Sequence, residues 1–271
     1  MWNCSSPALV FALILSAASV RAHGPVSESI AALTAELARE PNRPELLLSR
    51  ARFHAQHEDW PAAHADLDRV DVITPGLANT SLLRGEVFLM AADLKKARAT
   101  FVQLIAAEPR LALAYDGLAR TMVGDGEFAG AAQAFGRAVE FSEQPAPILY
   151  YNQSSAFEKA GKPEEALAAL DAGIARIGPI VSLVTPAIEM DIAAGRFDAA
   201  IARVDVLLAS LPRKETWLVR RAEILEKAGR KTEARATWEQ ARAAFATLPE
   251  FRQSTLQMSQ LRARIEAALA R

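Results

Sequence analysis

The amino-acid sequence predicts an all-α solenoid built from about six stacked helix pairs. The first observation is an alanine that returns every 34 or 35 residues, in the series Ala63, Ala97, Ala131, Ala166, Ala200 and Ala234. The second is a bulky apolar residue four positions after each alanine, in the series Leu67, Phe101, Phe135, Leu170, Val204 and Trp238. Self-similarity at such a period is typical of helical repeats, in which each unit buries its apolar face against its neighbours.

Composition and charge are those of a folded chain without the marks of a nucleic-acid-binding protein. Of the 271 residues, 51% are hydrophobic and 23% are charged, which is too apolar a balance for a disordered chain. The formal net charge is -1. Nucleic-acid binding requires a basic face that neutralises phosphates, so we expect no nucleic-acid partner.

Each repeat contains the residues that separate a first helix, helix A, from a second, helix B. The repeats are predicted over 44–77, 78–111, 112–146, 147–180, 181–214 and 215–249. Position 15 of the repeat, the turn between the helices, is glycine in the last four repeats but Glu58 and Ala92 in the first two. Glycine suits this turn because it adopts a positive φ without steric cost.

The repeat resembles the tetratricopeptide repeat, and the resemblance covers roughly residues 44–249. It is clearest over Tyr115–Val139 and Tyr150–Leu170, where the small, aromatic and glycine positions agree. The resemblance implies a right-handed superhelical solenoid that acts as a non-catalytic scaffold and binds a peptide or a partner protein in a groove lined by helices A. The sequence lacks a glycine-rich phosphate loop and the GxSxG and HExxH motifs, so we expect no enzymatic activity and no cofactor.

The segments on either side of the repeats are predicted to be flanking helices. Residues 23–43 include the stripe Ile30, Leu33 and Leu37, which has helical spacing and is expected to pack under the first repeat. Residues 250–271 include the stripe Leu261, Ile265 and Leu269. This C-terminal segment is expected to cap the last repeat, because the end of a solenoid otherwise exposes an apolar face.

Residues 1–22 are predicted to be a signal peptide, which places the mature protein outside the cytoplasm, in the periplasm. An apolar run over Pro7–Val20 is followed by Val20-Arg21-Ala22, a sequence suited to signal peptidase, although no Lys or Arg precedes the run. The run is too short to span a bilayer comfortably, so no membrane span is expected after cleavage. The alternative is a segment that is retained as an anchor.

The resemblance also implies which side chains face the groove, because positions 2, 5, 9, 12 and 13 of each repeat point into it. The strongest candidates are Arg52, Asn79, Glu86, Asp116, Arg120, Tyr151, Glu158, Glu189 and Glu223. The groove is then basic near Arg120 and acidic toward Glu189 and Glu223, which suits an extended peptide or a helix of another protein. The alternative is that these are ordinary solvated charges on helix faces.

Two further residue sets suggest small ligands. His23, His54 and His57 lie close together in the sequence, and imidazole is a ligand for Cu, Zn and Ni, so the alternative function is a metal- or small-ligand-binding accessory protein of the periplasm. Arg50, Arg84 and Arg221 share repeat position 7 and suggest an oxyanion site. The simpler interpretation is that the stem of each arginine packs while its guanidinium reaches water.

Overall fold

The structure is a computed structural model that describes residues 24–271, so the predicted signal segment and His23 lie outside the described residues. Within residues 24–271 all regular elements are helices, and consecutive helices pack in pairs, which confirms the predicted all-α repeat fold. The described chain divides into two compact units, and the boundary between them in the sequence lies between Pro75 and Gly76. Each unit is described by itself.

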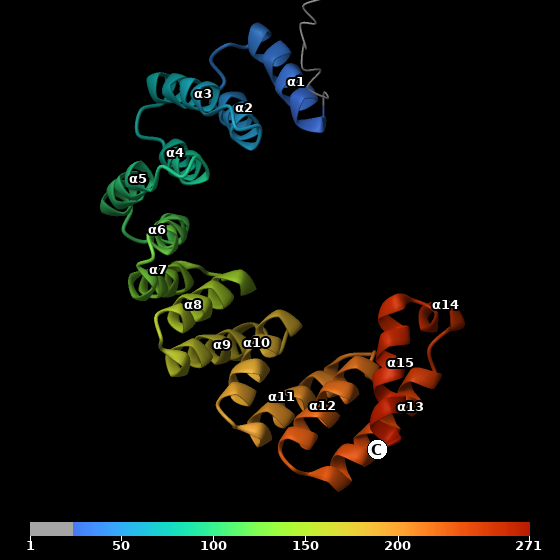
Figure 1. Cartoon of the computed structure of the whole chain (residues 1–271). Coiled ribbons are helices and arrows are strands. Elements are labelled where there is room, and N and C mark those ends of the chain that lie inside the picture. Colours follow the sequence, from blue (N-terminus) through green and yellow to red (C-terminus); the bar gives the residue numbers. More distant parts are fainter. Residues whose placement is uncertain (1–23) are drawn as a thin grey trace, which may run out of the picture. The chain divides into compact units, whose positions relative to one another are not determined.

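Unit 1 consists of three helices, drawn in blue to blue-green in Figure 1. These are α1 (Pro25–Arg39), α2 (Pro44–Gln56) and α3 (Trp60–Ile73). Helix α2 packs against both α1 and α3. Leu37 of α1 is buried, whereas Ile30 and Leu33 are half-buried, so the apolar stripe of α1 faces the unit along its length.

Unit 2 contains five helix pairs followed by two further helices (Figure 1). The pairs are α4 (Ala78–Met90) with α5 (Leu94–Ala107), α6 (Ala112–Gly124) with α7 (Phe128–Phe141), α8 (Pro147–Lys159) with α9 (Pro163–Ile177), α10 (Val181–Ala193) with α11 (Phe197–Ser210), and α12 (Glu215–Lys227) with α13 (Lys231–Ala246). The last helices are α14 (Glu250–Gln253) and α15 (Leu256–Leu269). The first helix of each pair is a helix A and the second is a helix B.

The predicted C-terminal capping segment is divided into two helices. Thr255 begins α15, and its hydroxyl accepts a hydrogen bond from the N–H of Met258 at 3.4 Å, as an N-cap residue does. Leu261 and Ile265 of α15 are buried in one core with Trp238 of α13. Helix α15 therefore covers the apolar surface of the last pair, while the short α14 carries the exposed Phe251.

The turn between helix A and helix B has the same backbone conformation in all six pairs. Position 15 has a φ of 61° at Glu58 and 57° at Ala92, and of 72° to 77° at the four glycines. In every pair the N–H of position 16 donates to the carbonyl of position 11, at 2.8 to 2.9 Å. This bond closes the helix end in a Schellman motif, which requires a left-handed residue at position 15. Glu58 and Ala92 adopt that conformation at a steric cost that glycine avoids.

Replacing Ala92 by glycine is expected to raise the free energy of unfolding by about 0.5 to 1 kcal/mol, because the left-handed strain is relieved. Ala92 is exposed, so little packing is lost. The reverse change, Gly126→Ala, should cost about 1 kcal/mol, since a Cβ there meets nothing within 4 Å and the effect is confined to the backbone. Urea denaturation measures both; a destabilised Ala92→Gly variant would contradict the assignment of strain.

One aromatic side chain occupies the core between the first two repeats of unit 2. Phe101 of α5 is fully buried. A Cβ built on Gly85 of α4 would lie 2.6 Å from its Cε1 atom, and a Cβ on Gly117 of α6 would lie 2.3 Å from it. Separations of this kind are far below van der Waals contact, so the ring fits only because both neighbouring helices present glycine.

Candidate functional site

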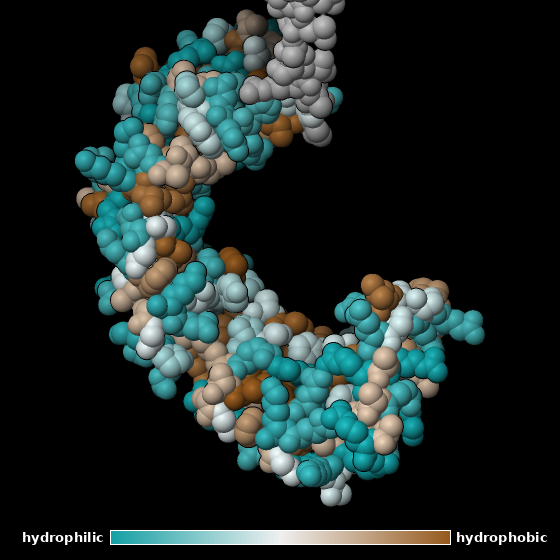
Figure 2. All heavy atoms as spheres, in the orientation of Figure 1, coloured by the Kyte–Doolittle hydropathy of each residue, from teal (hydrophilic) through white to brown (hydrophobic). Residues whose placement is uncertain are grey.

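The helices A of unit 2 form one surface. Contacts join α4 to α6 and α8 to α10, so residues about 34 positions apart in the sequence become neighbours. We call the exposed surface of α4, α6, α8, α10 and α12 the A face. Figure 2 shows brown, apolar patches among teal, polar ones over α8 and α10.

The structure places the predicted groove residues unevenly. Arg52 is exposed on α2 and belongs to unit 1. In unit 2 the exposed members are Asn79, Arg120, Tyr151, Glu158 and Glu189, and the half-buried ones are Glu86, Asp116 and Glu223. Four of them, Arg120, Tyr151, Glu158 and Glu189, line the hollows described below, whereas Asn79, Glu86, Asp116 and Glu223 line none of these.

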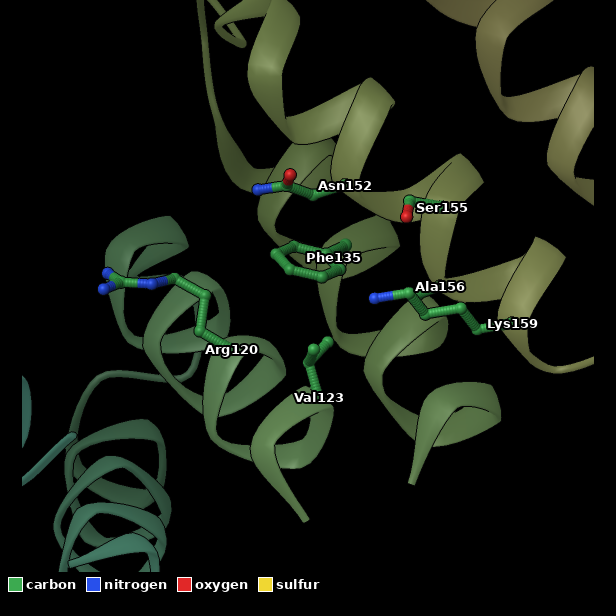
Figure 3. A pocket seen from close by; sticks show the side chains of 7 residues that line it. All are labelled: Arg120, Val123, Phe135, Asn152, Ser155, Ala156 and Lys159. Carbon is green, nitrogen blue, oxygen red and sulfur yellow. The ribbon is translucent and has the colours of Figure 1, made fainter. Parts of the chain in front are cut away.

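A first hollow, the basic pocket, lies between α6 and α8 and has a volume of about 170 Å³. Its lining is Arg120, Val123, Phe135, Asn152, Ser155, Ala156 and Lys159. Figure 3 shows Arg120 on one side and Lys159 on the other, with the ring of Phe135 between them and Asn152 above the ring. The described lining thus combines two cations, an amide and a hydroxyl, with no carboxylate. These groups suit a ligand that carries a carboxylate, because each of them can donate a hydrogen bond.

A second hollow, the acidic groove, lies between α8 and α10 and has a volume of about 570 Å³. Its charged lining residues are Glu158, Glu164, Glu189 and Arg196, and its other members include Tyr151, Pro186 and Met190. The guanidinium of Arg196 is already engaged, because its Nε donates to Asp191 Oδ1 at 2.7 Å. In the described part of the chain, Glu158 and Glu164 form no ion pair, so the groove is negative.

A third hollow, the apolar pocket, adjoins the acidic groove at Tyr151. It has a volume of about 440 Å³ and is lined by Ala146, Pro147, Ile148, Tyr151 and Ser182. Ile148 is 56% exposed and Tyr151 is 43% exposed, and Val181 nearby on α10 is also exposed. Large apolar side chains that remain exposed beside a pocket are typical of binding surfaces.

Asp116 does not line the basic pocket itself but lies beside Arg120, which does. Its side chain is half-buried on α6, and burial raises the pKa of its carboxyl above the ordinary value, although the charge of Arg120 acts in the opposite direction. The two side chains form a long ion pair of 3.8 Å between Nη1 and Oδ2. Arg120 therefore has donors that remain available, and it is 43% exposed.

The expected acidic end of the groove is largely neutralised, which corrects the interpretation from the sequence. Glu189 of α10 pairs with Arg220 of α12, and Glu223 pairs with Arg264 of α15. Arg220 Nη1 also lies 3.6 Å from Glu223 Oε2. Arg220 and Arg264 were absent from the predicted set, since repeat position 6 is not a groove position and the capping helix has no counterpart in the repeats.

In the first repeat, the arginine at repeat position 7 stabilises the packing of the helices through hydrogen bonds to neighbouring side chains. Arg50 donates from Nε and Nη2 to Asp66 at 2.8 and 2.6 Å, and from Nη1 to Thr34 at 3.0 Å. The hydrogen bond to Asp66 raises the pKa of Arg50. The guanidinium is therefore held by a buried carboxylate, and the Arg50 side chain is only 15% exposed, whereas the sequence suggested a guanidinium that reaches water freely. Arg221 is similar, because it donates to Asp205 and Thr237.

Of the histidines that suggested a metal site, the structure describes His54 and His57, and neither belongs to a larger group of ligand side chains in residues 24–271. His54 Nδ1 is 3.7 Å from Asp59 Oδ2, whereas His57 is exposed. No group of three or more His, Cys, Asp or Glu side chains with metal-binding geometry occurs among residues 24–271. Within the same range, no helix combines the length and the apolar character that a membrane span requires.

Comparison with known families identifies the repeat. The sequence model of the tetratricopeptide repeat matches residues 117–179 and 191–249, which lie in unit 2; these ranges include all of α7, α8 and α9 but only the last three residues of α10. A comparison with curated protein sequences finds no match.

Solved structures with the same fold come from several bacteria. The C-terminal part of a TPR repeat-containing protein from Cytophaga hutchinsonii has a TM-score of 0.62 and 13% identity, over 83% of this chain and 92% of that one. PilF from Pseudomonas aeruginosa has a TM-score of 0.54 and 14% identity, over 83% and 99%. YrrB, described as a TPR protein with an unusual peptide-binding site, has a TM-score of 0.50 and 14% identity, over 66% and 91%. At these identities the likeness establishes the fold.

Proposed function

Because this chain is a tetratricopeptide repeat protein, we propose that it is a non-catalytic interaction module that binds a peptide or an extended segment of a partner protein on the A face. The observation that carries the proposal is the row of three hollows along α6, α8 and α10, lined by charged and exposed apolar side chains. Stacked repeats of this kind offer extended surfaces to which each helix contributes one or two side chains. The fold is one that typically carries no catalytic residues.

The anchors of the interface are proposed to be Arg120 and Tyr151. Binding energy at protein interfaces concentrates in aromatic and arginine side chains beside pockets. Tyr151 lines both the acidic groove and the apolar pocket, and Arg120 lines the basic pocket. Both side chains are exposed, so their replacement changes the surface with little effect on the packing of the helices.

The double variant Arg120→Ala with Tyr151→Ala is expected to weaken partner binding by about 2 kcal/mol or more. The partner is first identified with a photoreactive residue at position 151 and, as a control, at position 206. Val206 is 46% exposed on α11, a helix B, and so matches the 43% exposure of Tyr151 on the other face. Equal crosslinking at both positions, or unchanged affinity of the double variant for the crosslinked protein, would refute the assignment of the A face.

Export is a separate proposal that rests on the sequence of residues 1–22. We expect the mature chain to begin at His23, because Val20-Arg21-Ala22 provides the small residues that signal peptidase requires. Intact-mass spectrometry of protein recovered from the periplasm measures this directly. A mass that retains residues 1–22 would support the alternative of an uncleaved anchor.

A further inference from the structure

We propose that the apolar pocket and the acidic groove together bind an extended segment of a partner protein that carries an apolar side chain and, four and five residues away, two basic side chains. The inference rests on the proposed function, because it specifies the class of segment that the interaction module binds. The occupant is thus a basic segment with an apolar anchor, in contrast to an acidic one.

The apolar pocket and the acidic groove form one continuous channel along α8 and α10, since both hollows are lined by Tyr151. The lining residues of each helix are three or four positions apart and therefore form one stripe. The stripe is Ile148, Tyr151, Ser155 and Glu158 on α8, and Ser182, Pro186, Glu189 and Ala193 on α10. The apolar pocket lies at the N-terminal ends of both helices, and the acidic groove reaches their C-terminal ends.

The C-terminal end of the channel is negatively charged. Glu158 and Glu164 line this end and are exposed, and neither forms an ion pair among the described residues. Lys159 follows Glu158 in the sequence but does not neutralise it, because its ammonium group lies 5.6 Å from the centroid of the Phe128 ring on α7. Two carboxylates therefore remain available to basic side chains of a ligand.

The other charged residues of the channel are balanced by partners. Glu189 pairs with Arg220 of the next helix A. Arg196 belongs to a set of two arginines and two aspartates joined by ion pairs, whose other members are Asp191, Arg203 and Asp171. The net charge that a ligand meets in the channel is thus that of the two unpaired glutamates.

The N-terminal end of the channel is apolar. Ile148 and Tyr151 remain exposed there, and the described lining of the pocket includes no charged residue. Val181, which is also exposed, precedes Ser182 at the start of α10 and extends the apolar surface onto that helix. An apolar side chain of a ligand would cover these residues and remove their surface from water.

The wall of the channel contains a backbone acceptor without its helical donor. Pro186 lies within α10 and has no N–H, so the carbonyl of Ser182, four residues earlier, lacks the donor that an α-helix supplies. Both residues line the channel, which places this carbonyl on the channel side of α10. An extended peptide has free N–H groups to donate, whereas a helical ligand uses its own beyond the first turn. The acceptor therefore favours an extended segment.

The length of α8 sets the distance between the apolar and the basic side chains of the segment. Ile148 and Glu158 are ten residues apart on this helix, which corresponds to about 15 Å along its axis. An extended chain advances about 3.3 Å per residue. The basic side chains are therefore expected about four and five residues from the apolar one, and two of them match the two glutamates. Either direction of the bound chain satisfies this distance.

The test uses fluorescent fourteen-residue peptides of a single composition, with one phenylalanine and two adjacent lysines in a background of serine, glycine and alanine. The series varies the separation of the lysines from the phenylalanine in both directions, and fluorescence anisotropy gives each dissociation constant. We expect lysines at four and five positions, in at least one direction, to give about threefold or more tighter binding than lysines next to the phenylalanine. The preference should diminish as salt is raised, because the glutamates are exposed.

Three outcomes of this series would overturn the inference. The first is equal affinity for all separations, and the second is the absence of measurable binding to any peptide. The third is tightest binding at a separation of about ten residues, because a helical ligand advances only about 1.5 Å per residue and would cover the same distance with that spacing. A peptide with two glutamates in place of the lysines should bind more weakly than its parent, and tighter binding would likewise reject the charge assignment.

A double variant connects the preference to the two glutamates. Glu158→Gln with Glu164→Gln should make the affinity independent of where the lysines lie. The matched control is Glu140→Gln with Glu239→Gln, which removes two exposed carboxylates from helices B outside the channel and should leave the preference unchanged. A preference that survives the first double variant, or that is lost equally in the control, would overturn the inference.

A second variant tests the apolar end of the channel. Ile148→Ala should weaken binding of the tightest peptide by about threefold or more, because less apolar surface is covered. The control is Val206→Ala on α11, a similarly exposed apolar residue on a helix B, which should leave the affinity unchanged. Equal effects of the two substitutions would contradict the assignment of the apolar anchor.

The outcome is separable from the proposed function. If photocrosslinking at position 151 captures a partner on the A face but the peptide series shows no preferred separation, the interaction module stands and its proposed specificity is wrong. If crosslinking is equal at positions 151 and 206, the A face itself is wrong and the specificity is rejected with it.

Discussion

Replacing Arg50 by leucine is expected to destabilise unit 1 by about 3 to 5 kcal/mol, because it leaves the buried carboxylate of Asp66 without its partner. The side chain of Asp66 is only 4% exposed, and two hydrogen bonds from Arg50 hold it. The same variant removes the bond from Arg50 to Thr34, which joins α2 to α1. Hydrogen exchange of the amides of α1, α2 and α3 measures the effect where it occurs.

Two controls separate the loss of the pair from the loss of a charge. Arg43→Leu removes an ion pair in the same unit in which both side chains are about half exposed, and it should cost no more than about 1 kcal/mol. The double variant Arg50→Leu with Asp66→Leu should recover most of the lost stability, since a buried ion pair can be replaced by apolar side chains of similar volume at little cost. A double variant as unstable as Arg50→Leu would show that the salt bridge is not the cause.

Replacing Phe101 by alanine is expected to lower the free energy of unfolding of unit 2 by about 3 to 5 kcal/mol. The ring is fully buried, and its neighbours at Gly85 and Gly117 have no side chains that could move into the space. The cost of a large-to-small substitution increases with the volume of the cavity that remains, so the loss of stability at this site should lie toward the upper end of that range. Urea denaturation measures the change, and a loss below about 1 kcal/mol would mean that the helices close over the cavity.

Gly117→Ala provides an independent test of the same contact. In the native background the new methyl group collides with the ring, and we expect a loss of about 1 to 3 kcal/mol despite the better helix propensity of alanine. In a Phe101→Leu background the same substitution should become neutral or stabilising. Gly130→Ala on α7 is the matched control, because the nearest atom, Met122 Sδ, is at 3.4 Å and only the propensity gain of about 1 kcal/mol remains.

The repeat fold could be predicted because its determinants recur at one interval. All six alanines of the series are at most 2% exposed, so they stand where helices approach most closely. The left-handed turns follow from the four glycines in the same way. The break between α14 and α15 could not be predicted from an interval, since the capping segment has no counterpart in the repeats. The sequence feature that marks the start of α15 is local: Thr255 caps the helix by accepting a hydrogen bond from the N–H of Met258.

The candidate site could be predicted in part. Arg120, Tyr151 and Glu158 were found from repeat positions, and they do line hollows of the surface. Asn152 was missed, although Asn152, Ser155 and Lys159 have the spacing of one helix stripe and this pattern could have revealed them. The pairing of Glu189 with Arg220 and of Glu223 with Arg264 joins residues 31 and 41 positions apart. Such pairs depend on the tertiary arrangement, and no periodic pattern specifies them.

The ring of Phe101 has a consequence for how this array can evolve. The residue belongs to helix B of one repeat, while the two glycines that accommodate it belong to helices A of the same repeat and of the next. A duplication that placed another repeat after α5 would set the ring against a residue other than Gly117, unless the inserted copy also had glycine at its sixth position. The second and third repeats are therefore not interchangeable modules. They should be inherited as a linked pair, and gain or loss of units is expected at the other junctions of the array.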